Sequence, residues 1–593
     1  MKIGLEIHQQ LDTGKLFCSC PCTLRDDPPS GTVRRRLRAV IGETGEMDPA
    51  ALMEMQKDKC FVYEFYDDTT CLVELDEEPP QGMNAKALDA ALQIAKLLDM
   101  TPVPRIQVMR KLVIDGSNPS GFQRTALIAQ DGTLKTSAGI IRIETLCLEE
   151  EAARIIGKDR QDVFFRLDRQ GIPLIEIATA PDISSPEQTK EVAQKLGMVL
   201  RSIHSLKRGI GTIRQDINIS IPKGNRVEIK GAQELRLIPE YVKQEVARQE
   251  SLVRLMPRLR KASLSKETEI TSLFKNTQSH LLNGAIRNGE GVFGLLLKEG
   301  AGLMGTSLIE GVRLGTDWAQ YAKNHSGIGG ILHGDELPAY GMTQEEVDGV
   351  KKQLGVKKND GYLIFVGQKD VVLKAIAVVR ERHTKLKLGP PEEVRLPNPG
   401  GTTAYLRPLP GAARMYPETD VLPIVPDLRS VTAPETIDER IARYEKQFSL
   451  PPELSRGAVI AGIPLAALVK QYPHIMPNVI VDLLVVVPKE ISKRFHADIN
   501  ASPHIGLLFP LLDTGRLTRE GAFEWLAEQA KGNDPSIESY LKLAPHELNK
   551  EVNAILKGES LHAKAAIGKV MAKLRGRAEG KDIVAAVNEF CRS

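Results

Sequence analysis

Apolar and polar residues alternate in several short runs of the first part of the chain, up to about residue 265. Such alternation is typical of β-strands, because successive side chains of a strand point to opposite faces of a sheet. The pattern predicts strands over residues 2–11, 140–144, 174–178, 213–221 and 227–230. Apolar residues that recur every three or four positions predict helices over residues 84–98, 186–202 and 239–254. Together these elements indicate an α+β domain with a mostly antiparallel sheet.

Polar side chains occupy many positions of these predicted strands. They are Glu6, His8, Glu176, Arg214, Asp216, Asn218, Glu228 and Lys230. An ordinary sheet would expose such residues to solvent on its outer face. The mixture of acids, histidine, arginine and lysine fits a concave polar site equally well. The alternation alone leaves both interpretations open.

The rest of the chain changes its pattern twice. Residues near 270–395 are glycine-rich at first and then follow an order of strand, helix, strand and helix, which indicates an inserted α+β domain. Residues 405–426 return to short, proline-punctuated strands. From about residue 430 to the end only helical patterns remain. The sequence therefore predicts an α+β multidomain protein with an all-α C-terminal region.

Composition limits the class of protein. The 593 residues are 42% hydrophobic and 26% charged, which is ordinary for a globular protein. The net charge of +3 excludes a polybasic, histone-like protein, so local basic patches would have to meet any nucleic acid. The seven cysteines are too few for a disulfide scaffold, and no apolar run has the length of a signal peptide or a membrane span. We therefore expect a cytoplasmic location and no membrane contact.

Basic residues gather near the C-terminus. Lys569, Lys573 and Arg577 recur at every fourth position and would form one stripe on a helix. Charge spacing alone favours a solvated helix face over a binding surface.

Several common catalytic and nucleotide-binding motifs are absent from the sequence. There is no phosphate-binding loop, no dinucleotide fingerprint, no nucleophile elbow and no HExxH zinc motif. Cys18, Cys20 and Cys22 could form half of a zinc site, but Cys60 and Cys71 are distant in the sequence and differently spaced. We therefore do not expect zinc.

An acidic run, residues 149–151, admits two interpretations. Such a run is usually the solvated start of a helix. Close to Glu6, His8 and Glu176 it could instead supply ligands to Mg²⁺, a hard cation that prefers carboxylate oxygens and bridges to substrate phosphates.

Longer motifs resemble one known family. The matching segments are IGLEIH at 3–8, DRQGIPLIEI at 168–177, PDISSP at 181–186, GTIRQDINIS at 211–220 and VEIK at 227–230. These segments resemble the cradle domain of the GatB/GatE amidotransferase family, and the likeness covers nearly the whole chain. The inserted segment resembles the insert domain of bacterial-type aspartyl-tRNA synthetases. That insert and the run YLRPLPGAARMYPETDV at 405–421 favour the archaeal GatE type over the bacterial GatB type.

The resemblance implies a division into domains. A cradle catalytic domain would occupy residues 1–268 and 401–430, interrupted by the synthetase-like insert at 269–400. A helical domain at 431–540 and a YqeY-like tail at 541–593 would follow, because GKVMAKLRGRAEGK at 568–581 resembles the tail that contacts tRNA in this family.

The resemblance also implies an activity. Members of this family convert Glu-tRNA(Gln) to Gln-tRNA(Gln): ATP, with Mg²⁺, activates the glutamate as a γ-glutamyl phosphate, and ammonia then displaces the phosphate. An asparaginase-like partner, GatD, would supply the ammonia and dock on the first domain, and two copies of each of the two chains are expected. The alternative is a non-catalytic tRNA-binding module. A synthetase-like enzyme lacks support, because no synthetase catalytic domain surrounds the insert.

Site residues are carried over to matching positions of this sequence. The resemblance places the metal ligands at Glu6, His8, Glu149 and Glu176. It makes Lys111, Glu149 and Glu176 the catalytic residues; a lysine on a solvated turn is the alternative for Lys111. The expected cavity wall is formed by Arg214, Asp216, Glu228, Lys230 and Arg414. The expected tRNA-binding residues are Lys569, Lys573, Arg575, Arg577 and Lys581.

Overall fold

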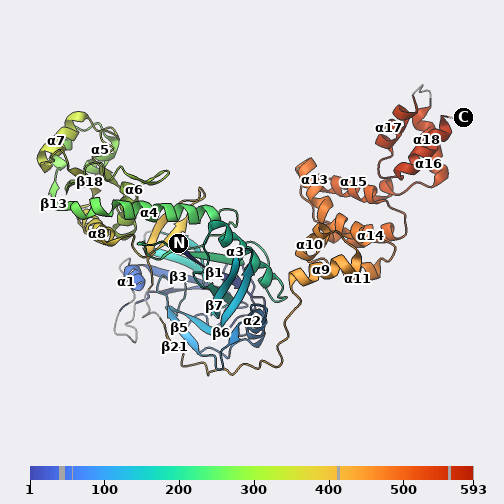
Figure 1. The fold of residues 1–593 in the computed structure, drawn as a ribbon, viewed down its shortest axis with the longest axis horizontal. Helices are drawn as coiled ribbons and strands as arrows, with labels where there is room; N and C mark the ends of the chain where they lie inside the picture. The colour runs from blue at the N-terminus through green and yellow to red at the C-terminus, as the bar shows by residue number, and fades with distance from the viewer. Residues whose placement is uncertain are drawn as a thin grey trace. The chain divides into compact units, whose positions relative to one another are not determined.

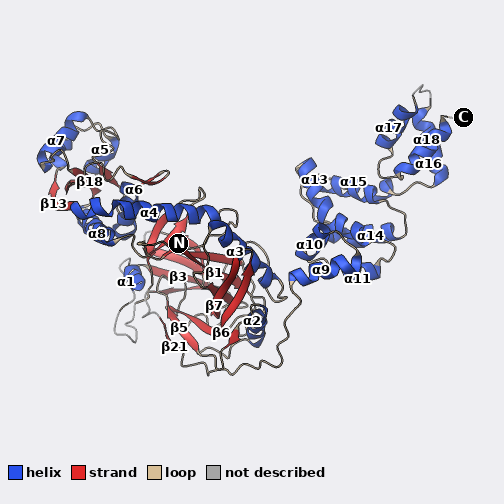
Figure 2. Ribbon diagram, in the orientation of Figure 1, coloured by secondary structure: helices blue, strands red, loops and turns tan. Residues whose placement is uncertain are grey.

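The computed structural model of the chain divides into two compact units, Met1–Pro434 and Glu435–Ser593. The described residues are 1–38, 47, 49–55, 58–159, 161–410, 415–557 and 562–591. Figures 1 and 2 show sheets flanked by helices in the first unit and only helices in the described part of the second. The predicted α+β multidomain fold with an all-α C-terminal region is confirmed.

A large sheet with 11 described strands forms the centre of the first unit. In spatial order these are β20 (Thr403–Pro408), β19 (Glu393–Pro397), β12 (Val227–Ile229), β11 (Ile213–Ser220), β1 (Lys2–Gln10), β10 (Pro173–Thr179), β7 (Gly139–Glu150), β6 (Phe122–Thr136), β5 (Val108–Leu112) and β21 (Met415–Pro417), with β4 (Thr101–Pro102) beside β6. The pair β12–β19 is parallel. The other described pairs of this sheet are antiparallel, as the sequence predicts.

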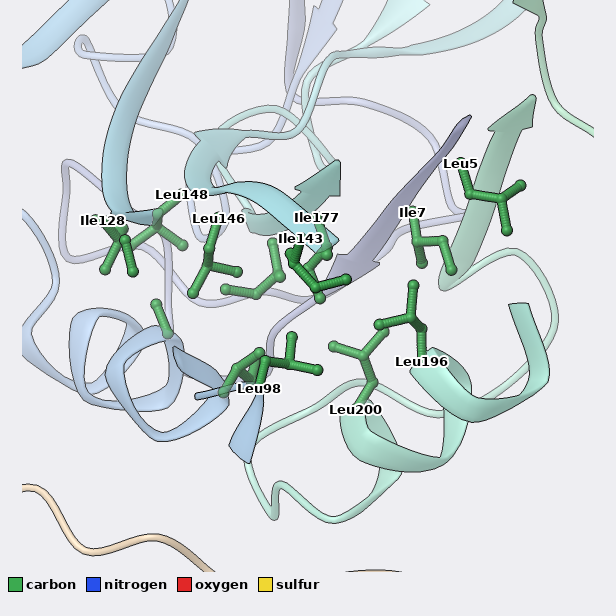
Figure 3. Close-up of a cluster of buried hydrophobic side chains, with 14 of the residues drawn as sticks. Leu5, Ile7, Leu98, Ile128, Ile143, Leu146, Leu148, Ile177, Leu196 and Leu200 are labelled. Atoms are coloured by element: carbon green, nitrogen blue, oxygen red, sulfur yellow. The ribbon is translucent and has the colours of Figure 1, made fainter. Parts of the chain in front are cut away.

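The apolar face of this sheet packs against helices α2 (Ala85–Leu97), α3 (Pro186–Arg201) and α4 (Ile238–Lys261). The Asn84 side chain caps α2 by accepting hydrogen bonds from the next backbone N–H groups. Burial of each leucine or isoleucine in this core contributes about 1.5–3 kcal/mol. Figure 3 shows strand and helix side chains meeting here, among them Leu5, Ile7, Ile143, Leu146, Ile177, Leu98, Leu196 and Leu200.

Core formation decides where the polar residues of β1 lie. Leu5 and Ile7 are buried against the helices. Because side chains alternate along a strand, Glu6 and His8 must lie on the opposite face of the sheet.

A second sheet in the first unit was not anticipated from the sequence. Its strands are β2 (Gly31–Arg35), β3 (Cys60–Phe65), β9 (Asp162–Arg166) and β8 (Arg154–Lys158), with α1 (Pro49–Met55) in the same region of the chain. Phe61, Tyr63 and Phe165 form its apolar cluster, in which the rings of Tyr63 and Phe165 stack with centroids 5.7 Å apart.

The inserted segment has a sheet of its own. Its strands are β13 (Ser263–Glu269), β14 (Gly291–Lys298), β18 (Gly361–Gly367) and β17 (Ile331–His333), and a hairpin joins β15 (Ser307–Ile309) to β16 (Val312–Arg313). Its helices are η1 (Thr271–Phe274), α5 (His280–Arg287), α6 (Leu314–Ser326), α7 (Gln344–Leu354) and α8 (Lys369–Leu388).

The limits of the insert differ from the expected 269–400. Its sheet begins earlier, at Ser263, where the chain leaves α4. The large sheet resumes at Glu393, because β19 pairs with β12. The strand β19 therefore belongs to the large sheet, although the sequence assigned it to the insert.

Buried charges join the insert to the large sheet. Three arginines and three acids, each with a side chain no more than 2% exposed, form one ion-pair cluster between α4, α6, α8 and β19. Arg382 lies 2.8 Å from Asp317 and 2.5 Å from Glu393. The members of this buried ion cluster are Glu245, Arg248, Asp317, Arg382, Glu393 and Arg395.

The described residues of the second unit form two apolar clusters, one with members from Ile437 to Tyr540 and one with members from Leu543 to Phe590. The first comes from α9 (Ile437–Phe448), α10 (Pro452–Ile460), α11 (Leu465–Gln471), α12 (Pro477–Val481), the π-helix η3 (Asp482–Val486), α13 (Val487–Phe495), α14 (Ile505–Asp513), α15 (Arg519–Ala530) and η5 (Ile537–Tyr540). The short helix η4 (Ser502–His504) precedes α14. The second comes from α16 (Pro545–Leu556), α17 (Ala563–Lys573) and α18 (Gly580–Phe590).

Among the described helices, none taken singly has both the length and the apolar composition needed to cross a membrane. The pair α10 and α11 meets those two criteria only when combined, and it is bent by 101°.

Candidate active site

A cavity of about 590 Å³ lies on the polar face of the large sheet. Its volume falls within the range of about 300–1,000 Å³ that is usual for ligand pockets. Nine residues predicted for the site line it: Glu6, His8, Lys111, Glu149, Glu176, Arg214, Asp216, Glu228 and Lys230. The alternation of polar and apolar residues left open that these polar residues form a solvated outer face. The structure instead places them around a cavity.

Strand register brings these residues together. His8 on β1 lies opposite Glu176 on β10 and opposite Arg214 on β11. Glu6 lies opposite Asp216 in the same way. Because directly opposed residues in a sheet share one face, the central strand β1 gathers side chains that are far apart in the sequence.

The centre of the cavity is rich in carboxylates. The Nε2 atom of His8 lies 3.1 Å from Glu176 Oε2 and 3.3 Å from Glu6 Oε1. The Nζ atom of Lys111 lies 2.9 Å from Glu149 Oε1 and 3.5 Å from Glu176 Oε2. Lys111 therefore does not sit on a solvated turn but faces the acids from β5.

Electrostatics reflect this crowding. Burial and the neighbouring charge of Glu176 raise the pKa of Glu6. Burial opposes the charged form of His8, but hydrogen bonds to Glu176 and Glu6 outweigh it and raise the pKa of His8 from 6.5 to about 10. Burial likewise opposes charge on Glu176, but the Lys111 ammonium and the His8 hydrogen bond hold the pKa of Glu176 well below its usual value. The two carboxylates that flank His8 thus have pKa values shifted in opposite directions.

The donor atoms fit a divalent cation. Ligand atoms of His8, Glu149 and Glu176 lie within 4.8 Å of one another, and so do those of Glu6, His8 and Asp216. Carboxylate oxygens are the ligands that Mg²⁺ prefers. Asp216, which the sequence placed in the cavity wall, is thus close enough to join the donor set.

Basic residues occupy another wall of the cavity. Arg214 forms an ion pair with Glu151, and Lys230 lies 3.3 Å from Asp216 and 3.6 Å from Glu228. Five further polar residues line the cavity: Gln123, Glu151, Asn218, Arg226 and Arg407. Of these, Asn218 was among the polar strand positions and Glu151 was in the acidic run that the sequence singled out, whereas Gln123, Arg226 and Arg407 were not predicted for the site. Asn218 alternates with the predicted site residues of its strand, so the period-2 pattern was a signal for it. The others reach the cavity through strand register and loop paths, which a local pattern does not encode.

One predicted residue, Arg414, lies outside the described residues. The segment that follows it is held beside Lys111, because Met415 on β21 lies opposite Lys111 on β5. The buried carboxylate of Glu418 fixes this segment by accepting hydrogen bonds from Arg110 Nη2 at 2.6 Å and from Arg124 Nε at 2.8 Å.

Comparison with known proteins places the chain in a family. A family model described as the GatB/GatE catalytic domain matches residues 1–431. The chain belongs to the GatB/GatE family. A relative from Methanocaldococcus jannaschii, named as the E subunit of glutamyl-tRNA(Gln) amidotransferase, is 44% identical over 100% of this chain and 98% of its own. Relatives with the same name from Pyrococcus furiosus and Thermococcus gammatolerans are 41% and 40% identical, over 94% and 98% of this chain and 91% and 96% of their own. These relatives confirm the resemblance to the archaeal GatE type.

This GatB/GatE chain has a second cluster of possible metal ligands in the first unit. Ligand atoms of Cys18, Cys20, Cys71 and Glu74 all lie within 4.8 Å of one another. The thiol of Cys18 donates to Glu74 Oε1 at 2.7 Å, and the backbone N–H of Cys71 donates to Glu74 Oε2 at 2.7 Å. Three thiols and a carboxylate form a donor set that zinc accepts. The expectation that zinc is absent stays a prediction, although folding brings Cys71 close to Cys18 and Cys20 despite their distance in the sequence.

The basic residues of the GatB/GatE chain's tail lie in the second unit. Lys569 and Lys573 are on α17, Arg575 and Arg577 follow it, and Lys581 is on α18. The predicted stripe of every fourth residue is wrong at its third member, because α17 ends at Lys573. Gly576 then turns the chain with a φ of 79°.

Exposure separates these tail residues. Lys581 is 77% exposed beside Glu579, and Arg575 is 59% exposed beside Glu524. Arg577 instead has a buried Nε atom with no hydrogen-bond partner among the described residues. Lys573 and Lys581 are both exposed to solvent.

Proposed function

We propose that this chain converts Glu-tRNA(Gln) to Gln-tRNA(Gln), as the catalytic subunit of an ATP-dependent amidotransferase. The observation that carries the proposal is the meeting of Glu6, His8, Glu149 and Glu176 with Lys111 in one cavity. The names of the relatives agree with this activity.

The chemistry starts from an unreactive group. The γ-carboxylate of glutamate is a poor electrophile, because its oxide is a poor leaving group. Transfer of the γ-phosphoryl group of ATP to a carboxylate oxygen gives a γ-glutamyl phosphate and ADP. Ammonia then attacks the carbonyl carbon, loses a proton, and expels inorganic phosphate, which leaves the amide of glutamine.

The residues of the cavity divide this work. Glu6, Glu149, Glu176 and Asp216, with His8, would hold Mg²⁺, which when bound neutralises charge on the transferring phosphoryl group. Lys111 offsets the charge of Glu149 and Glu176 and places its ammonium where a phosphoryl oxygen can be bound. Both roles depend on preorganised positions, which the register of β1, β10, β7, β6 and β5 supplies.

Ammonia must reach the cavity in its neutral form and away from water, because ammonium is not nucleophilic. In this proposal an asparaginase-like partner, GatD, releases it from an amide donor and passes it to the first unit, in a complex of two copies of each chain. The exposed cations of the tail hold tRNA phosphates.

A reconstitution tests the proposal. The chain, the asparaginase-like partner, Glu-tRNA(Gln), ATP, Mg²⁺ and an amide donor are incubated, and the amino acid on the tRNA is analysed. Formation of Gln-tRNA(Gln) that depends on ATP supports the proposal. Tight tRNA binding with neither product nor tRNA-dependent ATP cleavage would instead identify a non-catalytic tRNA-binding module.

A further inference from the structure

Strand β20 contains a β-bulge beside the cavity. On β19, Arg395 lies opposite Tyr405. The next pair along the two strands joins Val394 to Arg407. Leu406 is therefore an extra residue on β20, without an opposite residue on β19. Bulges of this kind often lie next to active sites, where they change the direction of a side chain.

The bulge allows Tyr405 and Arg407 to face opposite sides of the large sheet. Tyr405 packs with Tyr321 on α6 and Val378 on α8, both of which belong to the insert. Arg407 lines the cavity on the polar face, and Leu409 does so as well. In a regular strand, residues two positions apart share one face. Without the extra residue, Arg407 could not reach the cavity while Tyr405 stays packed against the insert.

Helix α6 of the insert holds this bulge. The Nδ2 atom of Asn324 donates hydrogen bonds to the carbonyl oxygens of Tyr405, at 2.7 Å, and of Leu406, at 3.4 Å. The Nε2 atom of His325 lies 2.8 Å from the Tyr405 hydroxyl. Asn324 and His325 lie in the last turn of α6. A bulge interrupts the ladder of backbone hydrogen bonds, and the Asn324 amide supplies a donor at that interruption.

Arg407 does not stabilise its own orientation. Its Nε atom is buried and has no hydrogen-bond partner among the described residues. A buried polar atom without a partner is unfavourable, because its lost hydration is not replaced. The direction of Arg407 must therefore be stabilised from elsewhere, and the contacts of α6 with β20 lie at the bulge that sets it.

We propose that Asn324 is a positioning residue for the cavity: it fixes the bulge at Leu406 and thereby directs Arg407 into the cavity. His325 supports the same contact through the Tyr405 hydroxyl. The insert thus has a role in the reaction that needs no contact between the insert and a substrate. This inference rests on the proposed function, since the positive charge of Arg407 is there to offset the acids of that cavity.

A double-mutant cycle separates positioning from general stability. The full chain with its partner is assayed for Gln-tRNA formation, with Asn324→Asp made both in the unmodified chain and in Arg407→Gln. Aspartate has the shape of asparagine but lacks the amide donor. Asn324→Asp should lower kcat at least about tenfold in the unmodified chain and less than about twofold in Arg407→Gln, because the group it positions is then already missing.

Two results of this cycle would overturn the inference. One is an equal loss in both backgrounds, because a merely structural defect is additive with the loss of Arg407. The other is an Arg407→Gln chain that is as active as the unmodified chain.

Asn283→Asp is the matched control. Asn283 also belongs to the insert, on α5, and its Nδ2 atom donates to the Thr277 carbonyl oxygen at 3.3 Å. Its replacement should leave kcat within about twofold of the unmodified chain. If Asn324→Asp melts at a lower temperature than this control, Asn324→Ala takes its place in the cycle, and an equal loss in both backgrounds is again contradictory.

Hydrogen exchange of the β20 amides tests the bulge without the reaction. Asn324→Asp should speed this exchange on the order of tenfold, and Asn283→Asp should leave it unchanged. Unchanged exchange in Asn324→Asp refutes the inference even if the chain forms Gln-tRNA. A chain whose exchange responds as expected but which forms no Gln-tRNA supports the role of Asn324 at the bulge and refutes the amidotransferase.

Discussion

Replacement of Glu418 by glutamine should loosen the segment beside Lys111. The Glu418 carboxylate is fully buried and receives hydrogen bonds from Arg110 and Arg124. Burial opposes its charge, but the two arginines lower the pKa of Glu418 from 4.5 to about 2. A shift of this size corresponds to about 3 kcal/mol that favours the folded state when the carboxylate is ionised.

The pH dependence follows from the direction of this shift. Because the folded-state pKa is lowered, the stabilisation is fully present above about pH 4.5 and is lost as the pH falls toward about 2. Hydrogen exchange of the β21 and β5 amides measures local opening, which a global unfolding curve of a multidomain chain does not resolve. At pH 7, Glu418→Gln should speed this exchange on the order of a hundredfold.

Asp420→Asn is the matched control for Glu418→Gln. Asp420 also pairs with Arg110, at 3.1 Å, but its side chain is 49% exposed, so its loss should cost less than about 1 kcal/mol. Equal exchange rates for Glu418→Gln and the unmodified chain at pH 7 would refute this reasoning. A difference that stays constant down to pH 2 would refute it as well, because the protonated carboxyl should then resemble glutamine.

Two further predictions concern other parts of the chain. Asp317→Asn leaves unpaired positive charge in the buried ion cluster and should lower the free energy of unfolding of the first unit by about 3–5 kcal/mol in denaturant titrations. The control is Asp348→Asn, at a side chain that is 61% exposed, which should change this free energy by less than about 0.5 kcal/mol. Equal effects of the two variants would show that burial does not determine the loss of stability. The double variant Lys573→Gln and Lys581→Gln should weaken tRNA binding and reduce its salt slope by about one unit per lost phosphate contact; an unchanged slope would exclude the tail from RNA contact.

Much of the large sheet was predictable, because the sequence pattern is strongest where one face of a strand is buried. The alternation in residues 2–11 predicted β1 and placed Glu6 and His8 on its polar face, and the structure agrees. The same holds for Glu176 on β10. Burial of their apolar neighbours determines this orientation, so a local pattern suffices.

Other features depend on contacts between distant segments. Cys71 approaches Cys18 only through folding, and Arg407 reaches the cavity through three successive strand pairings. The basic stripe failed for a local reason, since Gly576 and the end of α17 interrupt the period of four. Lys111 and Glu149 were assigned to the site by the resemblance of sequence motifs and not by alternation. In the structure Lys111 Nζ lies 2.9 Å from Glu149 Oε1.

The central claim is that the acids of the cavity support phosphorylation of the glutamate carboxylate. Hydroxylamine tests it directly, because it traps an acyl phosphate as a hydroxamate without ammonia or an amide donor. With Glu-tRNA(Gln), ATP and Mg²⁺, the chain should yield γ-glutamyl hydroxamate on the tRNA. Glu149→Gln or Glu176→Gln should lower that rate on the order of a hundredfold or more at unchanged tRNA affinity. Hydroxamate formed at the unmodified rate by either variant would contradict the account.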